Sequence, residues 1–283
     1  MSRTSAARNI PGAGAIGPGP VLVGILNVTP DSFSDGGDFF DPEPAAQHAA
    51  AMLDEGAAII DVGGESTRPG SDPVPQEEEV RRVIPVIEGI LAVRPEAVIS
   101  IDTYRAETAT VALEAGARVV NDVSALRADP RMASVVAEAG CPVVLMHMKG
   151  EPKTMQEEPF YEDVVREVRE FLARRAEFAL AAGVRPENVI VDPGIGFGKN
   201  LEHNLALLRD LDTIVDLGFP VLLGASRKGF IGTITGVEQA SKRVFGTVAT
   251  TVLAYQKGAR YFRVHDVRAN RDALAIAEAV LRA

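Results

Sequence analysis

Short apolar runs rich in β-branched residues recur along the chain, and longer stretches with helical spacing separate them. The runs span residues 21–27, 57–64, 97–103, 117–123, 142–148, 188–194, 220–226 and 259–267. One of the stretches between them, 161–182, places Val164, Val168, Leu172 and Ala176 on one face of a helix. Strands this apolar leave no face for water, so the pattern predicts a parallel sheet covered by helices on both sides.

A glycine stands just before six of these runs, where the preceding helix is expected to end. These glycines are Gly56, Gly116, Gly140, Gly183, Gly218 and Gly258. Glycine reaches positive φ without steric cost and so caps helices well. Eight strand–helix units predict an α/β protein with a closed (β/α)8 TIM barrel, as a single domain over residues 21–283. An open doubly wound sheet is the alternative, but the first run ends in NVTP and lacks the GxGxxG of that fold.

Composition and charge narrow the class of protein further. Residues 1–20 are rich in Gly, Ala and Pro and are expected to form a flexible leader without the apolar stretch of a signal peptide. The net charge is -10, from 39 Asp and Glu against 29 Lys and Arg, which argues against a nucleic-acid surface. The single cysteine, Cys141, cannot form an intrachain disulfide and is expected to serve packing. No apolar run approaches the ~20 residues of a membrane span. We therefore expect a cytoplasmic protein that binds neither nucleic acid nor membrane.

Polar and charged residues stand at the carboxyl ends of nearly all the predicted strands. They are Asn27, Asp61, Asp102, Asn121, His147, Asp192, Ser226, Arg227, Lys228, Arg263 and His265. Any one of them could simply cap the following helix. Because TIM barrels place their active sites at this end, the whole set predicts one shared site. His147 and His265 have no close partner for a zinc site and are expected to act as hydrogen-bonding histidines.

The basic residues gather at the last two strands. Ser226, Arg227 and Lys228 follow the seventh strand, and Arg263 and His265 alternate on the eighth, which puts both side chains on one face. Barrels often bind phosphate at this corner, so the pattern indicates an anionic substrate. Two glycine-rich loops, TPDSFSDGG after the first strand and GGESTRPG after the second, are expected to be mobile lids.

These residues resemble the dihydropteroate synthase family from residue 21 to the end of the chain. Eight stretches match in order, each at a predicted strand end: GILNVTPDSFSDGG, DVGGESTRPG, SIDT, NDVSAL, LMHMKGEPKTMQ, DPGIGFGK, GASRKGFIG and RVHDV. The resemblance implies that the chain condenses hydroxymethyl-dihydropterin pyrophosphate with p-aminobenzoate to dihydropteroate and pyrophosphate. It also implies a homodimer and Mg2+ as cofactor.

The resemblance assigns roles to individual residues. It implies a pterin site made of Asp102, Asn121, Met146, Asp192, Phe197, Lys228 and Arg263, of which Asp102, Lys228 and Arg263 are catalytic. It implies that Asn27, Arg263 and His265 meet the pyrophosphate, with Asn27 as the magnesium ligand. It assigns Phe33, Asp35, Thr67, Arg68, Pro69, Ser226 and Gly229 to p-aminobenzoate and the lids. Gly229 departs from members that carry a serine there, so its backbone N–H is expected to take over the carboxylate contact.

Two alternatives remain open at this point. A methyltetrahydrofolate-dependent corrinoid methyltransferase has a related barrel and could share Asp102, Asn121 and Asp192, but it has no reason to hold pyrophosphate. A non-catalytic paralogue would bind the pterin without turnover. Release of pyrophosphate that needs both Mg2+ and p-aminobenzoate distinguishes the synthase from both.

Overall fold

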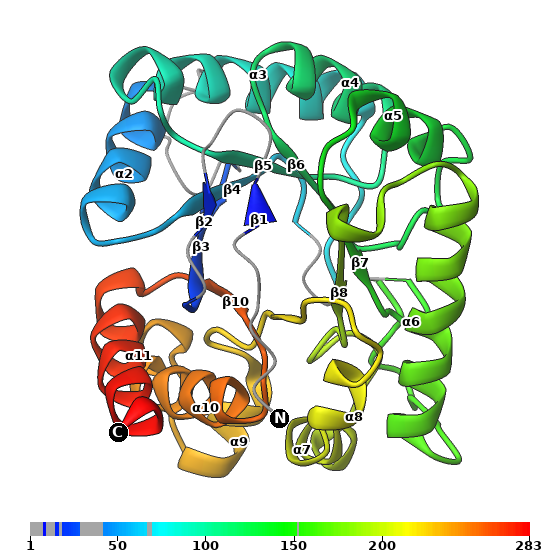
Figure 1. The fold of residues 1–283 in the computed structure, drawn as a ribbon, viewed down its shortest axis with the longest axis vertical. Coiled ribbons are helices and arrows are strands. Elements are labelled where there is room, and N and C mark those ends of the chain that lie inside the picture. The colour runs from blue at the N-terminus through cyan, green and yellow to red at the C-terminus, as the bar shows by residue number, and fades with distance from the viewer. Residues whose placement is uncertain (1–7, 10–14, 17–18, 29–41, 67–69, 152) are drawn as a thin grey trace.

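Eight parallel strands form a barrel at the centre of the molecule, and helices surround it (Figure 1). The computed structural model describes residues 8–9, 15–16, 19–28, 42–66, 70–151 and 153–283. The barrel strands are β3 (Val21–Asn27), β4 (Ile59–Gly63), β5 (Ile99–Asp102), β6 (Val119–Asp122), β7 (Val143–Met146), β8 (Val189–Asp192), β9 (Leu222–Leu223) and β10 (Tyr261–Val264). Each lies within one of the eight predicted runs.

The order of the strands closes the sheet on itself. Along the sheet the order is β8-β7-β6-β5-β4-β3-β10-β9, and every pairing is parallel. A parallel bridge between Val191 and Val221 joins the first strand of this order to the last. The predicted (β/α)8 barrel is therefore confirmed, and the open doubly wound alternative is wrong.

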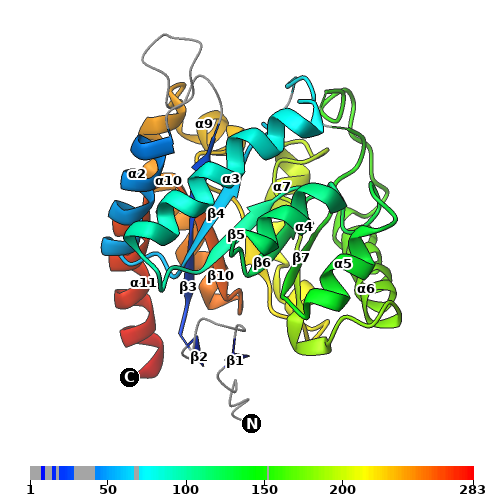
Figure 2. The same ribbon diagram turned by 90° about the horizontal axis from the view of Figure 1, so that it is seen from above.

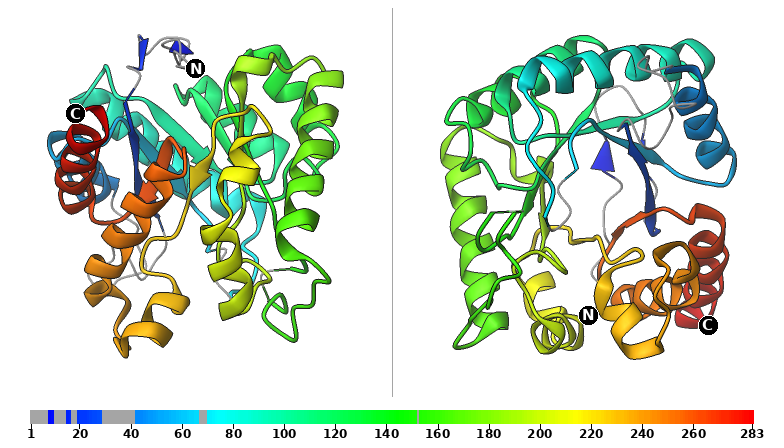
Figure 3. Two further views of the ribbon diagram at one scale, coloured as in Figure 1. Left: turned by 60° about the horizontal axis from the view of Figure 1, so that its bottom comes forward. Right: turned by 180° about the vertical axis from the view of Figure 1, so that it is seen from behind.

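Helices follow the strands and cover the outside of the barrel (Figures 1 and 3). They are α2 (Pro42–Asp54), α3 (Gln76–Val93), α4 (Ala106–Glu114), α5 (Met132–Ala139), α6 (Val164–Ala181), α7 (Leu201–Arg209), α8 (Asp212–Val215), α9 (Gly229–Thr235), α10 (Val244–Gln256) and α11 (Val267–Arg282), with 3-10 turns η1 (Pro186–Asn188) and η2 (Ala240–Lys242). All six predicted capping glycines have positive φ, and Gly140 at +61° directly ends α5. The helix predicted at 161–182 is α6, with its predicted apolar face buried.

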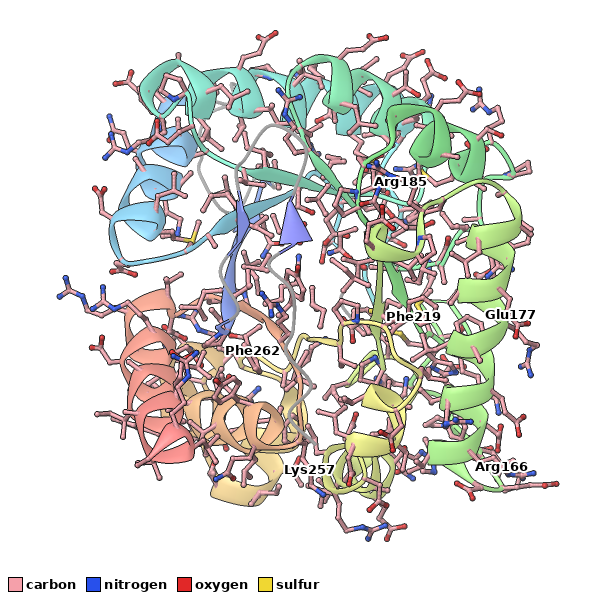
Figure 4. All side chains as sticks on the ribbon, viewed as in Figure 1. Arg166, Glu177, Arg185, Phe219, Lys257 and Phe262 are labelled. Carbon is pink, nitrogen blue, oxygen red and sulfur yellow. The ribbon has the colours of Figure 1, made fainter. Side chains whose placement is uncertain are left out.

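The apolar core has two parts. The larger part lies between the strands and the helices: Phe262 of β10 is fully buried there, with its ring 6.3 Å from that of Tyr255 on α10. Figure 4 shows the contrast with Arg166 and Glu177 of α6, which point away from the barrel. The smaller part fills the barrel interior and is called the apolar floor below. It consists of Val21, Val23, Ile59, Val98, Val119, Val144, Ile190, Leu222 and Tyr261.

The N-terminal segment contributes a small strand pair. β1 (Arg8–Asn9) and β2 (Ala15–Ile16) pair antiparallel at the end of the barrel where β3 begins, opposite α9 (Figure 2). Most of residues 1–20 lie outside the described residues, so the flexible leader stays a prediction. None of the described helices is long and apolar enough to span a bilayer.

Candidate active site

Inside the barrel, side chains change from apolar to polar along the strands. Because side chains alternate between the two faces of a strand, the residue two positions after a floor residue also points inward. These positions hold Asp61 after Ile59, Asn121 after Val119, Asp192 after Ile190 and Arg263 after Tyr261. The apolar floor therefore supports a layer of buried polar groups on its carboxyl-end side.

A cavity of about 440 Å³ opens above this layer, at the carboxyl ends of the strands. Its wall includes several predicted site residues: Asn27, Asp102, Phe197, Ser226, Lys228, Gly229, Arg263 and His265. Gly224, directly after β9, also lines the cavity. A Cβ at Gly224 would lie 3.6 Å from the carboxylate of Asp192. The absence of a side chain at Gly224 thus leaves room above Asp192.

Arg263 is the centre of the charged network in this cavity. Its Nε donates to Asp61 at 2.6 Å, and an Nη atom donates to Asp102 at 2.8 Å. Asn121 donates from Nδ2 to the same oxygen of Asp61 at 3.0 Å. One guanidinium therefore holds two carboxylates from neighbouring strands in fixed positions.

The charges in this network shift one another's protonation. Burial raises the pKa of Asp102 to about 7, Arg263 acts in the opposite direction, and the Asp61 carboxylate adds to the rise. Burial acts to lower the pKa of Arg263, but Asp61 and Asp102 outweigh it and hold the pKa above its usual range. Arg263 is thus always charged, whereas Asp102 is poised to gain or lose a proton near neutrality.

Asp192 lies at the end of β8, where a glycine-rich loop follows. Its Oδ1 accepts from the backbone N–H of Gly194 at 2.7 Å. Burial raises the pKa of Asp192 to about 6, while that N–H and the charges of Lys228 and Lys199 oppose the rise. At pH 7.5 the group is a carboxylate whose other oxygen can accept N–H groups from a ligand.

The loop after β8 packs directly on the segment that follows β7. At Gly194, φ is +67°, and a Cβ there would overlap the carbonyl oxygen of His147. At Gly198, φ is +62°, and a Cβ would overlap the carbonyl oxygen of Lys149. Glycine is therefore required at both positions to bring Phe197 to the cavity, where the ammonium of Lys228 lies 3.9 Å from the centre of its ring.

Lys199 anchors this loop and was not singled out by the sequence. Its buried ammonium donates to the carbonyls of Gly194 and Phe197 at 2.9 and 2.8 Å and contacts Nδ1 of His147 at 2.9 Å. Burial lowers the pKa of Lys199 to about 7, and burial together with Lys199 lowers the pKa of His147 to about 2. His147 is thus a neutral hydrogen-bonding histidine, as predicted. The only sequence signal for Lys199 is its place directly after a GxGxG loop.

The loops after β9 and β10 are linked by two side-chain contacts. Ser226 Oγ lies 2.9 Å from Nδ1 of His265, and the backbone N–H of His265 donates to the same Oγ. Arg227 forms two hydrogen bonds with Asp266, at 2.6 and 3.0 Å. Arg227 has a φ of +58°, which is strained for a residue with a side chain. These hydrogen bonds between the two loops therefore hold Ser226, Arg227 and His265 in fixed positions.

The structure brings most of the predicted site residues together. Asn121, Met146 and Asp192 do not line the cavity wall itself and are buried on β6, β7 and β8. Gly229 begins α9, is exposed, and has open space where a Cβ would stand, so the missing serine has no steric cause. Phe33, Asp35, Thr67, Arg68 and Pro69 lie outside the described residues.

Comparison with known proteins decides the family. The model of the family described as "Pterin binding enzyme" matches residues 23–265. The dihydropteroate synthase of Haemophilus influenzae is 44% identical over 264 residues, which cover 93% of this chain and 95% of the relative. The chain belongs to the dihydropteroate synthase family. It is a transferase that condenses hydroxymethyl-dihydropterin pyrophosphate with p-aminobenzoate in folate biosynthesis.

Solved structures of dihydropteroate synthases have the same fold. That of the Xanthomonas albilineans enzyme with 4-aminobenzoic acid has a TM-score of 0.92 and 46% identity, and covers 99% of this chain and 100% of its own. A second structure from that organism, in complex with 7,8-dihydropteroate, has a TM-score of 0.88 and 44% identity, and covers 98% of this chain and 99% of its own. The relatives thus favour the synthase over the corrinoid methyltransferase.

Proposed function

We propose that the condensation takes place in the cavity at the carboxyl end of the barrel, with the pterin ring held over the buried polar layer. The observation that carries the proposal is the Arg263 network, in which one guanidinium fixes the catalytic candidate Asp102 beside the cavity. The ring would lie among Asn121, Met146, Asp192, Phe197 and Lys228, as the family resemblance implies.

The chemistry of these groups fits the polar edge of a pterin. That edge presents a row of N–H donors and one carbonyl. Asp192 has one oxygen not used by the Gly194 N–H, and as a carboxylate it accepts two adjacent donors. Lys228 supplies a cation for the ring carbonyl, and the guanidinium of Arg263 can stack on the ring face.

The reaction requires a leaving group to depart and a cation to be stabilised. Arg263 and His265 would bind the pyrophosphate. Arg263 lies on β10, and His265 follows that strand on the same face. As the bond to pyrophosphate breaks, positive charge spreads into the pterin, and the carboxylate of Asp102 stabilises it. The amine of p-aminobenzoate then attacks the methylene carbon, and the new C–N bond is left neutral when the nitrogen loses one proton to solvent or to the released pyrophosphate.

Magnesium is the proposed cofactor, with Asn27 as its protein ligand. Asn27 ends β3 at the cavity, and its side chain makes no hydrogen bond to another described residue. The described residues contain no cluster of three or more His, Cys, Asp or Glu that could hold a metal alone. One amide oxygen fits Mg2+ because this ion prefers few protein ligands together with phosphate oxygens and water. When bound with substrate, the ion would neutralise charge on the departing pyrophosphate.

The p-aminobenzoate is proposed to bind on the open side of the cavity. Ser226 and Gly229 line this region, and the Gly229 N–H is available at the first position of α9. The lid residues Phe33, Asp35, Thr67, Arg68 and Pro69 complete the pocket in this proposal. Their closure would exclude water, which otherwise traps the cation.

The deciding experiment measures pyrophosphate release by purified protein in single-omission reactions. We expect release only when the pterin pyrophosphate, p-aminobenzoate and Mg2+ are all present, with one dihydropteroate formed per pyrophosphate. Release without p-aminobenzoate would indicate hydrolysis. Binding of the pterin without any product would identify a non-catalytic paralogue and refute the proposal.

We also propose a homodimer formed through the later helices. A second, apolar hollow of about 920 Å³ lies between α7, α9 and α10, and Leu205, Ile234 and Leu253 are 41%, 57% and 62% exposed there. A second copy covering this face would bury them. Analytical ultracentrifugation should show a dimer that Leu253→Lys dissociates, whereas Phe178→Lys on α6 leaves it intact. A monomeric wild type would overturn this proposal.

We also propose that the protein resides in the cytoplasm. The one cysteine, Cys141, is buried and unpaired, in keeping with a compartment that forms no disulfides. Cell fractionation with an antibody against the protein is the direct test.

A further inference from the structure

Asp61 is the most deeply buried charged group of the site, and the resemblance gives it no role. It points into the barrel between the floor residue Ile59 and the inward-facing Gly63, and it is 1% exposed. Its Oδ2 accepts from Arg263 Nε at 2.6 Å and from Asn121 Nδ2 at 3.0 Å. These donors come from β10 and β6, which lie two strands away from β4 on opposite sides. One oxygen atom therefore joins two proposed pterin contacts across the barrel.

The carboxylate of Asp61 determines how its two donors are oriented. A carboxylate only accepts hydrogen bonds, so Asn121 must direct its NH2 group toward Asp61. Its carbonyl oxygen and its second N–H then remain for the ligand. In the same way, the Nε edge of Arg263 faces Asp61, which leaves an Nη atom for Asp102 and the guanidinium face free. Without the charge on Asp61, neither orientation is enforced.

In the described part of the fold, Asp61 uses only one of its two oxygens. Its second oxygen, Oδ1, is buried and has no hydrogen-bond partner among the described residues. Leaving such an acceptor unused costs about 1–3 kcal/mol. Arg263 would still have Asp102 as a partner if Asp61 were replaced by an amide, because it forms a separate ion pair with each of the two side chains. An apolar residue would leave Arg263 Nε and Asn121 Nδ2 without an acceptor, whereas an asparagine would keep one oxygen for them. What the carboxylate adds over an amide is a second acceptor and no donor, which points to a functional reason for it.

We propose that Asp61 is a positioning residue that orients the Asn121 amide and the Arg263 guanidinium toward the pterin. It touches neither substrate and acts through these two side chains. The inference rests on the proposed pterin site, because it concerns how that site is held in its binding arrangement.

The test compares Asp61→Asn with a control variant, Ser100→Ala. Ser100 is buried, faces inward, and lies opposite Asp61 on the neighbouring strand β5. We expect Asp61→Asn to raise the pterin KM about tenfold or more. A factor of this size corresponds to one hydrogen bond to the pterin, from Asn121 or Arg263, that is no longer correctly oriented. The KM for p-aminobenzoate and the urea midpoint should stay near the wild-type values. Ser100→Ala should change none of the three. A drop in stability that parallels the loss of activity would overturn the proposal.

A double-mutant cycle with Asn121→Ala tests whether Asp61 acts through Asn121. In that background the effect of Asp61→Asn on the pterin KM should be smaller than in the wild type. Two independent effects that multiply would refute the coupling. If Asn121→Ala alone leaves the pterin KM unchanged, the pterin site itself is wrong.

A measurement on the wild-type protein covers the case in which Asp61→Asn does not fold. In protein labelled with 15N-asparagine, the side-chain NH2 signal of Asn121 is assigned by its loss in Asn121→Ser. A proton donated to a buried carboxylate should exchange slowly with solvent in the ligand-free protein. Rapid exchange of both protons would overturn the proposed orientation, whatever ligand the site binds.

Discussion

Replacing Arg263 by Met tests whether one guanidinium holds two carboxylates inside the barrel. The change keeps most of the side-chain volume and removes the guanidinium that donates hydrogen bonds to both Asp61 and Asp102. These carboxylates are 1% and 8% exposed, so water does not replace the lost partner. Removing one member of such a buried pair costs roughly 3–5 kcal/mol of the free energy of unfolding.

The cost should depend on pH in a defined direction. Arg263 lowers the pKa of Asp102, which is about 7 in the wild type. In the variant the folded protein keeps the Asp102 proton to higher pH than the wild type does. Above about pH 7 the folded variant thus binds more protons than the folded wild type. The unfolded chain does not bind this proton at such pH, so the free energy of unfolding of the variant keeps falling by about 1.4 kcal/mol per pH unit. The deficit should be smallest near pH 6 and grow toward pH 9.

Urea unfolding of the wild type and Arg263→Met at pH 6, 7.5 and 9 measures this difference. The matched control is Arg94→Met, which removes an exposed ion pair to Asp54 at 3.0 Å. The control should lose no more than about 1 kcal/mol. A deficit for Arg263→Met that is as small as the control, or that does not change between pH 6 and pH 9, would refute the reasoning.

Three further predictions concern single groups. Asp102→Asn should lower kcat about a hundredfold and change the pterin Kd much less, because its charge is needed most in the transition state; stopped-flow binding and steady-state rates measure both, and equal losses would contradict the role. Pterin affinity should fall about tenfold per pH unit below about 6, where Asp192 becomes protonated; calorimetric titration from pH 5 to 7.5 measures it, and Asp192→Asn should bind weakly throughout. Burial raises the pKa of Cys141 to about 11, so it should react with a thiol reagent only after urea unfolding; fast labelling of the native protein would contradict this.

The barrel could be predicted from the sequence because its pattern is redundant. Each strand is a short apolar run, and a glycine at the end of the preceding helix stands before six of the eight, so most boundaries carried two signals. The strand ends were less well defined: the run predicted at 220–226 contains only Leu222–Leu223 as regular strand. The residues that follow leave the ladder to form the loop that carries Ser226 and Lys228.

The site was predicted only as far as local patterns reach. Alternation along a strand correctly put Arg263 and His265 on one face. The role of Asp61 could not be read in the same way, because its contact with Arg263 joins residues 202 positions apart and exists only when the barrel closes. Lys199 was missed because two of its acceptors are backbone carbonyls, which carry no sequence signal, and its side-chain contact with His147 joins residues 52 positions apart.

The apolar floor has a consequence for inhibitor design. Nearly every strand of the barrel contributes a side chain to this floor, and these side chains are closely packed. They cannot move aside for a ligand without disrupting the barrel. A compound bound at the polar layer thus cannot be extended deeper, whatever group is added. Gains in affinity or selectivity must come from growth toward the mouth, past Ser226 and Gly229, where the wall consists of loops. Screening libraries for this enzyme should vary that end of the molecule and keep the buried end constant.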